Sequence, residues 1–275
     1  DWCYFKIYGH PESLNLILRD PALLKLIEGF WKMEGIRRWF FVRYVDPQPH
    51  LRIRFQVSKN FGLVISTQLS ELVEKYMKSS LVMDFMVATY EPERQRYGCA
   101  GMSRVESIFQ RSSDLVLTFH QLNCSGTQET CFAFSSVALM LRDFIPDISG
   151  RLAFVNGLVK SILVSSSRRR QLDVYYRKHR ESLEQAAANP QKHDSDLVSE
   201  KLDRFSMRIL KFQSTWEGLE EVKHRTLIAD LIHMHLNRLN ASNRAGLETA
   251  VYYLLYKFYR SILSRSVEPI ERGRV

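Results

Sequence analysis

The chain has 275 residues, of which 45% are hydrophobic and 25% are charged, and this is the composition of an ordinary globular protein. Apolar stretches such as residues 152–164 contain Asn156 and Lys160 and are too short and too polar to cross a bilayer, so we expect no membrane span. The net charge of +9 predicts acidic partners, which include nucleic acid, acidic peptides and small polyanions.

The N-terminus begins Asp1-Trp-Cys-Tyr-Phe, with no initiator methionine and no basic segment followed by an apolar one. This pattern predicts a trimmed chain or an excised domain that carries no secretion signal. The four cysteines are Cys3, Cys99, Cys124 and Cys131. They form no C-x-x-C pair and are too few for a disulfide scaffold, so we expect a cytoplasmic protein.

The first hundred residues predict strands and helices in the order β, α, β, β, α, β, as in a split βαβ sandwich. Aromatic and β-branched residues indicate the strands, and apolar residues at helical spacing indicate the helices. The strands are expected at 2–8, 38–45, 50–57 and 80–89, and the helices at 21–33 and 63–78. Asp46-Pro-Gln-Pro49 predicts a hairpin with a stiff loop between the two middle strands.

Helical spacing dominates after about residue 101, and almost no strand pattern remains. The helices are expected at 103–122, 130–143, 148–164, 171–188, 197–216, 226–239 and 247–264. The predicted fold class is therefore α+β, with a sheet-bearing part at 1–100 and a mainly helical part at 101–275.

The third predicted strand alternates strictly between polar and apolar residues. Its polar face carries His50, Arg52, Arg54 and Gln56, and its apolar face carries Leu51, Ile53, Phe55 and Val57. Two arginines and a histidine on one wet face suit the binding of a carboxylate or a phosphate. The alternative is an exposed sheet face with incidental charge.

A second arginine pair, Arg94 and Arg96, follows the end of the fourth predicted strand beside Glu91 and Glu93. One interpretation is a set of structural ion pairs. The other is a group of functional side chains that the end of a rigid sheet holds in place.

The helix predicted at 226–239 carries two histidines. His233 shares a polar stripe with Asp230 and Asn237, whereas His235 falls among apolar residues. The two histidines diverge by about 200° around the helix, so they do not form a metal site together. A solvated stripe for His233 and a satisfied core histidine for His235 are the alternatives to a functional role.

The densest basic run, at 168–170 and 177–180, lies in a helical region and lacks the interleaved aromatic and glycine residues of an RNA-binding sheet. We interpret it as a solvated face in preference to a nucleic-acid site. The motifs for dinucleotide, P-loop, hydrolase-elbow and zincin sites are absent from the sequence.

Four ordered motifs together resemble a known family. They are W-x-Y-F-K-I-Y at 2–8, F-V-R-Y-x-D-P-x-P-H-L-R-I-R-F at 41–55, Y-E-P-E-x-x-R-Y-G at 90–98 and H-M-H-L-N-R-L at 233–239. They resemble the C-terminal domain of lantibiotic dehydratases, which is also found as stand-alone proteins in thiopeptide and related peptide biosynthesis. The resemblance covers nearly the whole chain.

The resemblance implies that a separate or fused glutamylation enzyme uses glutamyl-tRNA to esterify Ser or Thr of a precursor peptide. The present chain would then be one elimination domain that removes glutamate and leaves dehydroalanine or dehydrobutyrine, without a cofactor. The implied catalytic residues are Arg52, Arg54 and Arg96, which bind and stabilise the glutamate, and His233, which acts as acid and base, with His235 as its alternative. The implied substrate-binding residues are His50, Arg43, Arg94, His235, Asn237 and Arg238. A homo-oligomer is compatible with the resemblance.

Two alternatives remain. A relative of the same fold performs an aza-cycloaddition that builds the pyridine ring of thiopeptides, and because it has no glutamate to bind, the arginine set together with His233 favours elimination. A non-catalytic module that binds an acidic leader peptide or tRNA would bind without turnover.

Overall fold

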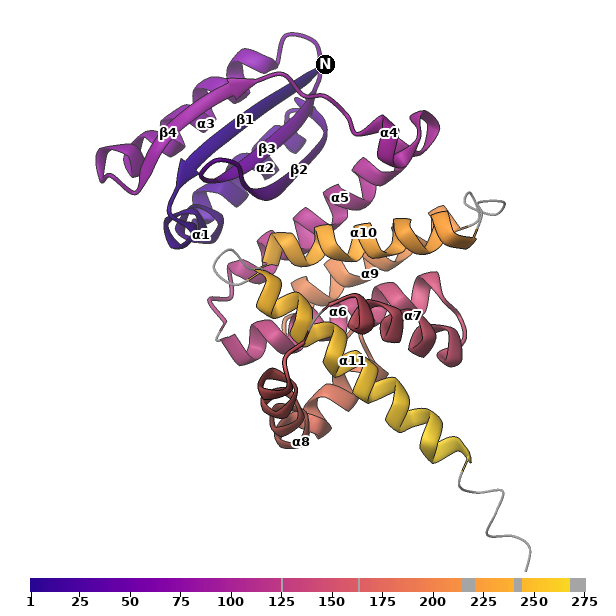
Figure 1. The fold of residues 1–275 in the computed structure, drawn as a ribbon. Helices are drawn as coiled ribbons and strands as arrows, with labels where there is room; N and C mark the ends of the chain where they lie inside the picture. The colour runs from indigo at the N-terminus through magenta and orange to yellow at the C-terminus, as the bar shows by residue number, and fades with distance from the viewer. Residues whose placement is uncertain (125, 163, 214–220, 240–243, 268–275) are drawn as a thin grey trace, which may run out of the picture. The chain divides into compact units, whose positions relative to one another are not determined.

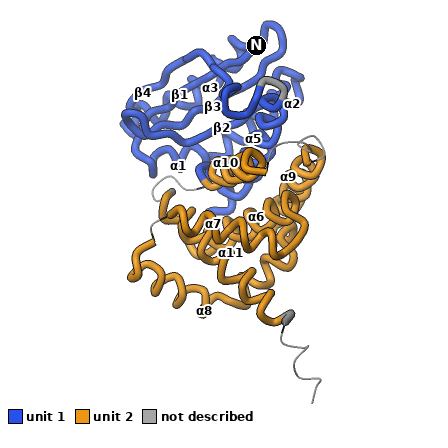
Figure 2. Tube along the Cα trace, turned by 45° about the vertical axis from the view of Figure 1, so that its right-hand side comes forward, with its two compact units in different colours: residues 1–124, 237–242 blue, residues 125–236, 243–275 orange. Residues whose placement is uncertain are grey.

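The computed structural model describes residues 1–124, 126–162, 164–213, 221–239 and 244–267 (Figure 1). Two compact units make up the chain (Figure 2). The first unit contains 1–124 and 237–242, and the second contains 125–236 and 243–275. The first unit thus runs beyond the limit at residue 100 that we expected for the sheet-bearing part. That both parts act as one elimination domain stays a prediction.

The first unit is built on a four-stranded antiparallel sheet. Its strands are β1 (Trp2–Gly9), β2 (Ile36–Val45), β3 (Pro49–Val57) and β4 (Val82–Ala88). They are ordered β2-β3-β1-β4, so β3 lies between β1 and β2. This order confirms the split βαβ prediction.

Five helices accompany this sheet in the described part of the first unit. They are α1 (Pro11–Arg19), α2 (Pro21–Lys32), α3 (Gly62–Lys78), α4 (Arg94–Tyr97) and α5 (Cys99–His120). The helix α1 was not predicted from the sequence, because a proline at position 11 is also typical of a turn. In the structure Pro11 is the first residue of the helix, where a proline loses no hydrogen bond, and the His10 side chain accepts from the Glu12 N–H. At four residues, α4 is too short to show a period.

One face of the sheet forms the core of the first unit. Phe5, Ile53 and Phe55 are fully buried on it, and Phe30 of α2 packs edge-on against Phe55 with ring centroids 5.7 Å apart. Complete burial of one such side chain stabilises the fold by about 1.5–3 kcal/mol. The apolar half of the alternating pattern in β3 therefore lies where the sequence predicted it.

The outer edge of β2 is closed by side chains instead of by another strand. The Phe41 N–H donates to Ser113 Oγ (3.1 Å), and Arg238 Nε donates to the Phe41 carbonyl (2.8 Å). Asn237 spans both main-chain groups of Arg43, since its Oδ1 accepts from the N–H and its Nδ2 donates to the carbonyl, each at 2.9 Å. These contacts satisfy groups that an open sheet edge would leave unpaired.

The second unit is helical. Its helices are α6 (Gly126–Phe144), α7 (Ile148–Ser161), α8 (Ser166–Ala188), α9 (Asp196–Gln213), α10 (Glu221–Leu239) and α11 (Arg244–Val267). The last residues of α10, 237–239, belong to the first unit. Every residue from Phe132 to Leu141 is buried, as expected for a helix that its neighbours surround on all sides.

The observed architecture confirms the α+β class. The helix expected at 148–164 ends at Ser161, and the last residues of the one expected at 197–216 lie outside the described residues. No helix in the described ranges is long and apolar enough to cross a membrane.

Candidate functional site

The guanidinium of Arg54 lies among aromatic rings on the polar side of β3. It lies 4.5 Å from the Tyr4 ring centroid, 4.9 Å from that of Tyr90 and 5.2 Å from that of Phe40. The side chain is buried, and it forms no hydrogen bond or ion pair with the described residues. Burial lowers the pKa of this guanidinium. The site therefore holds a desolvated cation that ring faces contact directly and that the Glu93 carboxylate stabilises only through its field.

The rings of Tyr4, Phe40 and Tyr90 form an aromatic cage around Arg54, and hydrogen bonding fixes the position of the Tyr90 ring in this cage. Its hydroxyl donates to Glu106 Oε1 at 2.9 Å, and Arg38 forms an ion pair with the other carboxylate oxygen at 2.9 Å. Burial and then the neighbouring Glu106 carboxylate raise the pKa of Tyr90 well above its usual value, so the phenol stays neutral. Trp2 packs edge-on against the same ring, with centroids 4.9 Å apart. Contacts that do not involve Arg54 therefore hold the Tyr90 ring of the cage in place.

Arg52 lies on the same face of β3, two residues before Arg54. Its guanidinium carbon lies 3.5 Å from the Tyr44 ring centroid, and its Nε donates to His50 Nε2 at 2.9 Å. His50 Nδ1 lies 2.8 Å from the Gln48 carbonyl oxygen, which only accepts, so Nδ1 carries the hydrogen and Nε2 is the acceptor. Burial lowers the pKa of His50, which favours this neutral form. His50 therefore orients Arg52.

The prediction that this face is wet is wrong for two of its four residues. His50 is 1% exposed and Arg54 is 9% exposed. Aromatic residues of β1 and β2 cover them, because Tyr4 and Phe40 are the register partners of Arg54 on its two sides. The same register places Lys6 opposite Arg52. Lys6 was not among the expected site residues, although the alternation in β1 places Trp2, Tyr4, Lys6 and Tyr8 on one face.

The second arginine pair lies on the short helix α4. Arg94 and Arg96 are both exposed, and Arg96 Nη1 lies 3.4 Å from Glu93 Oε2. The ion-pair interpretation therefore applies to Arg96 in this structure. An exposed pair of this kind contributes at most about 1 kcal/mol and is easily opened by a ligand anion.

In the second unit, His233 forms a dyad with a carboxylate. Its Nδ1 lies 3.0 Å from Glu248 Oε2 and 3.1 Å from Oε1, and the Tyr252 hydroxyl donates to the same carboxylate at 2.8 Å. A carboxylate accepts, so Nδ1 carries the hydrogen and Nε2 keeps a lone pair. His233 is 37% exposed at its side chain and Nε2 has no partner within the described residues. A histidine that a carboxylate orients through Nδ1, with an accessible Nε2, has the arrangement of a general base.

His235 lies in the core of the second unit. It is 1% exposed, its Nε2 lies 2.9 Å from Ser136 Oγ, and its ring stacks on Phe205 with centroids 5.3 Å apart. These are the surroundings of a satisfied core histidine. Of the two histidines, His233 has the accessible ring nitrogen that proton transfer requires.

Arg43, Asn237 and Arg238, expected from the resemblance to bind substrate, bind one another and β2. Arg43 Nε donates to the Arg238 carbonyl at 2.9 Å, and its Nη2 donates to His120 Nε2 at 3.3 Å. All three are buried. Burial lowers the pKa of Arg238 to about 9, and burial together with the Arg43 charge lowers that of His120 to about 3. The contacts of these three residues in the structure satisfy main-chain groups at the outer edge of β2.

The structure thus groups Arg52, Arg54, His50 and Lys6 on one sheet face, and it gives His233 the partner Glu248. The arginines belong to the first unit and His233 to the second, so their joint action stays a prediction. No cluster of three or more His, Cys, Asp and Glu side chains suited to a metal ion occurs in the described ranges.

A family model described as "Lantibiotic biosynthesis dehydratase C-term" matches residues 2–259. Subtilin biosynthesis protein SpaB of Bacillus subtilis is 24% identical over 263 residues, which cover 89% of this chain and 24% of SpaB. Nisin biosynthesis protein NisB of Lactococcus lactis subsp. lactis is 22% identical over 267 residues, which cover 95% of this chain and 26% of NisB. The chain therefore spans about a quarter of the length of these relatives.

Three solved structures share the fold. The tRNA-dependent lantibiotic dehydratase MibB from Microbispora sp. 107891 matches with a TM-score of 0.74 and 22% identity, over 97% of this chain and 28% of MibB. TsrL matches with a TM-score of 0.66 and 14% identity, over 95% of both chains. TbtD, a pyridine synthase from thiomuracin biosynthesis, matches with a TM-score of 0.70 and 13% identity, over 96% of this chain and 99% of TbtD.

Proposed function

Since this chain belongs to the lantibiotic dehydratase C-terminal family, we propose that it eliminates glutamate from glutamylated Ser or Thr residues of a ribosomally made precursor peptide. The products would be dehydroalanine and dehydrobutyrine. A separate or fused glutamylation enzyme that uses glutamyl-tRNA would supply the ester.

The single observation that carries this proposal is the buried guanidinium of Arg54, which forms no hydrogen bond or ion pair with the described residues. Transfer of an isolated charge out of water costs several kcal/mol, an amount that fixed ring faces offset only in part. A carboxylate that enters the cage would form charge-assisted hydrogen bonds with the fork of donors and remove this cost. The cage is therefore suited to an anion, and glutamate is an anion both in the substrate and as the leaving group.

The proposed reaction is a β-elimination. His233 Nε2 takes the Cα proton of the esterified residue, and Glu248 holds the resulting imidazolium. The electron pair of the broken Cα–H bond becomes the second bond between Cα and Cβ. The Cβ–O bond breaks, and its electron pair leaves with the glutamate carboxylate.

Each arginine has a separate task in this scheme. Arg54 neutralises a carboxylate of the glutamyl group inside the cage, and Arg52, oriented by His50, stabilises the oxygen that gains charge as the Cβ–O bond breaks. Arg96 exchanges its ion pair with Glu93 for the substrate. Such donors act more strongly in the transition state than in the ground state, which is how they lower the barrier.

The alternative is a pyridine-forming cycloaddition, since the likeness to TbtD covers nearly all of both chains. At 13% identity that likeness shows a common fold. Neutral dehydroalanines would leave the Arg54 charge uncompensated, so the cage favours elimination.

The test is a set of single variants of purified protein mixed with a peptide that carries one glutamyl-serine ester. We expect Arg52→Ala, Arg54→Ala, Arg96→Ala and His233→Ala each to slow the single-turnover release of glutamate by about 10²-fold or more. Arg37→Ala, an exposed arginine of β2, is the matched control and should retain the full rate. Unchanged release by all four variants would refute the assignment, and loss in His235→Ala alone would show that His235 is the base.

A further inference from the structure

A groove of about 520 Å³ runs between α8 and α11 in the second unit. Its lining contains four cationic side chains, two serine hydroxyls, one phenol and one carboxylate. These residues are Asp173, Tyr176, Arg177, Arg180, Lys257, Arg260, Ser261 and Ser264. No aliphatic residue lines it, and its polar surface presents hydrogen-bond donors and positive charge beside the carbon atoms of the same side chains.

The two helices are tied together at the base of the groove. Lys257 Nζ and the Tyr253 hydroxyl each lie 3.0 Å from Asp173 Oδ1, so the carboxylate of the lining is already bound. Tyr176 is 5% exposed, and its hydroxyl is buried beside Ser261.

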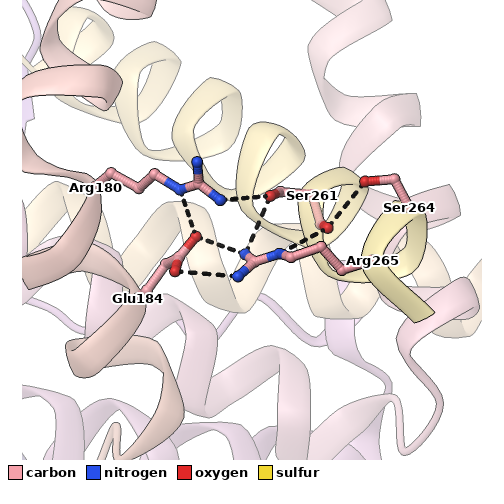
Figure 3. Close-up of polar contacts among 5 residues, drawn as sticks. All are labelled: Arg180, Glu184, Ser261, Ser264 and Arg265. Atoms are coloured by element: carbon pink, nitrogen blue, oxygen red, sulfur yellow. Dashed lines mark hydrogen bonds and ion pairs between the residues drawn. The ribbon is translucent and has the colours of Figure 1, made fainter. Parts of the chain in front are cut away.

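Contacts with Glu184 and Ser261 fix Arg180 at the wall (Figure 3). Its Nε donates to Glu184 Oε1 at 2.8 Å and its Nη2 donates to Ser261 Oγ at 3.3 Å, whereas its Nη1 has no acceptor within the described residues. Arg265 holds the same carboxylate from α11, with Nη2 2.6 Å from Oε1. Two arginines therefore share one glutamate, and an excess of positive charge remains beside the groove.

Arg177 and Arg260, on opposite walls, form no ion pair with the described residues. Lys257 and Arg260 are three residues apart on α11, about 4.5 Å along the helix axis, so they lie along one helix face. Arg177 and Arg180 lie on either side of a kink at His179 in α8, and both still line the groove. Four cations from two helices therefore gather in one groove, which suits a polyanion.

We propose that this groove binds the phosphodiester backbone of a single-stranded nucleic acid. Phosphate oxygens take donors of the kinds present here, namely Arg, Lys and Ser, and such contacts are independent of sequence. An acidic peptide is the weaker candidate, because peptide grooves use apolar side-chain pockets or an open strand edge and this lining has neither. The basic run at 168–170 and 177–180 was interpreted as a solvated face, and most of its basic side chains are exposed. Arg177 and Arg180 also belong to the groove.

The test measures fluorescence anisotropy of a labelled oligonucleotide of about twelve residues, in RNA and DNA form, with the full chain. The groove variant is Arg177→Gln/Lys257→Gln/Arg260→Gln, and the control is Arg170→Gln/Lys178→Gln/Arg204→Gln, three exposed cations outside the lining. In the groove variant we expect affinity to fall at least about tenfold near 0.1 M salt, and the slope of log K against log salt to shrink by about 2, at roughly 0.7 per lost contact. The control should retain affinity to within about threefold.

Equal losses in the two triple variants would overturn the proposal, since net charge alone would then explain binding. So would tighter binding of a polyglutamate peptide than of the oligonucleotides, or competition by inorganic phosphate at low millimolar concentration, because either would show that the occupant is not a nucleic-acid backbone. Glutamate release by the groove variant should be unchanged. The proposed elimination and this binding site can therefore fail independently.

Discussion

Replacement of Asn237 by alanine tests whether the H-M-H-L-N-R-L segment stabilises the fold or binds substrate. The Asn237 amide is 3% exposed and forms two hydrogen bonds of 2.9 Å with the main chain of Arg43. Asn237→Ala would leave a buried N–H and a buried carbonyl unpaired at the edge of β2. Each of the two orphaned groups costs about 1–3 kcal/mol, so we expect the free energy of unfolding to fall by about 2–6 kcal/mol.

The assay is urea unfolding followed by circular dichroism and tryptophan fluorescence, with the change read from the midpoint at constant slope. Asn156→Ala on α7 is the control, because the Asn156 side chain forms no hydrogen bond with the described residues, and it should change stability by less than about 0.5 kcal/mol. A loss below about 0.5 kcal/mol in Asn237→Ala, together with a large rise in KM for the glutamylated peptide, would refute the edge-closing role and favour substrate binding.

Three further predictions follow from the buried cation, the dyad and a buried histidine. Arg54→Met should raise the free energy of unfolding by about 1 kcal/mol, because it removes a desolvated charge, while glutamate release falls about 10²-fold; a destabilised variant would contradict the view that the cage lacks an internal partner. Glu248→Gln should slow release about tenfold or more but less than His233→Ala does, and a rate equal to that of wild type would show that the carboxylate does not orient the base. His120 has a folded-state pKa of about 3, far below its unfolded value of about 6.5. Between these two pH values the unfolded state binds one more proton than the folded state. The free energy of unfolding therefore falls as the pH falls from about 6.5 toward 3. Urea titrations at pH 6 and pH 5 give the loss of unfolding free energy over this pH unit, and that loss should be about 1.4 kcal/mol smaller in His120→Gln than in wild type. An equal pH dependence of the unfolding free energy in the two proteins would exclude His120 as its cause.

Much of the fold is visible in local patterns. Alternation in β3 and helical spacing in α3 each depend on a few neighbouring residues, so their existence was predicted and only their ends shifted. The strand order then follows from the element order, because a split βαβ unit places β3 between β1 and β2. The helix α1 was missed because Pro11 indicates a turn as well as it indicates a first helical position.

The site was predicted less completely, since burial depends on partners that are distant in the sequence. Arg54 was expected in water because nothing in β3 shows that Tyr4, Phe40 and Tyr90 surround it. Glu248, fifteen residues after His233, lies on another helix and no spacing rule connects the two. Asn237 shares a helix stripe with His233 in projection, yet its amide is bound to the main chain of β2.

The most direct test of the proposed elimination uses the purified full chain and a peptide with a single glutamyl-serine ester, without tRNA, ATP or added metal. We expect the peptide to lose the mass of one glutamic acid per ester and free glutamate to appear in equal amount. Glutamate at high concentration should inhibit by refilling the Arg54 cage. The contrary result is an untouched ester combined with ring closure in a peptide that already carries two dehydroalanines. An untouched ester combined with binding of the peptide would equally contradict the account, because it would identify a module that binds without turnover.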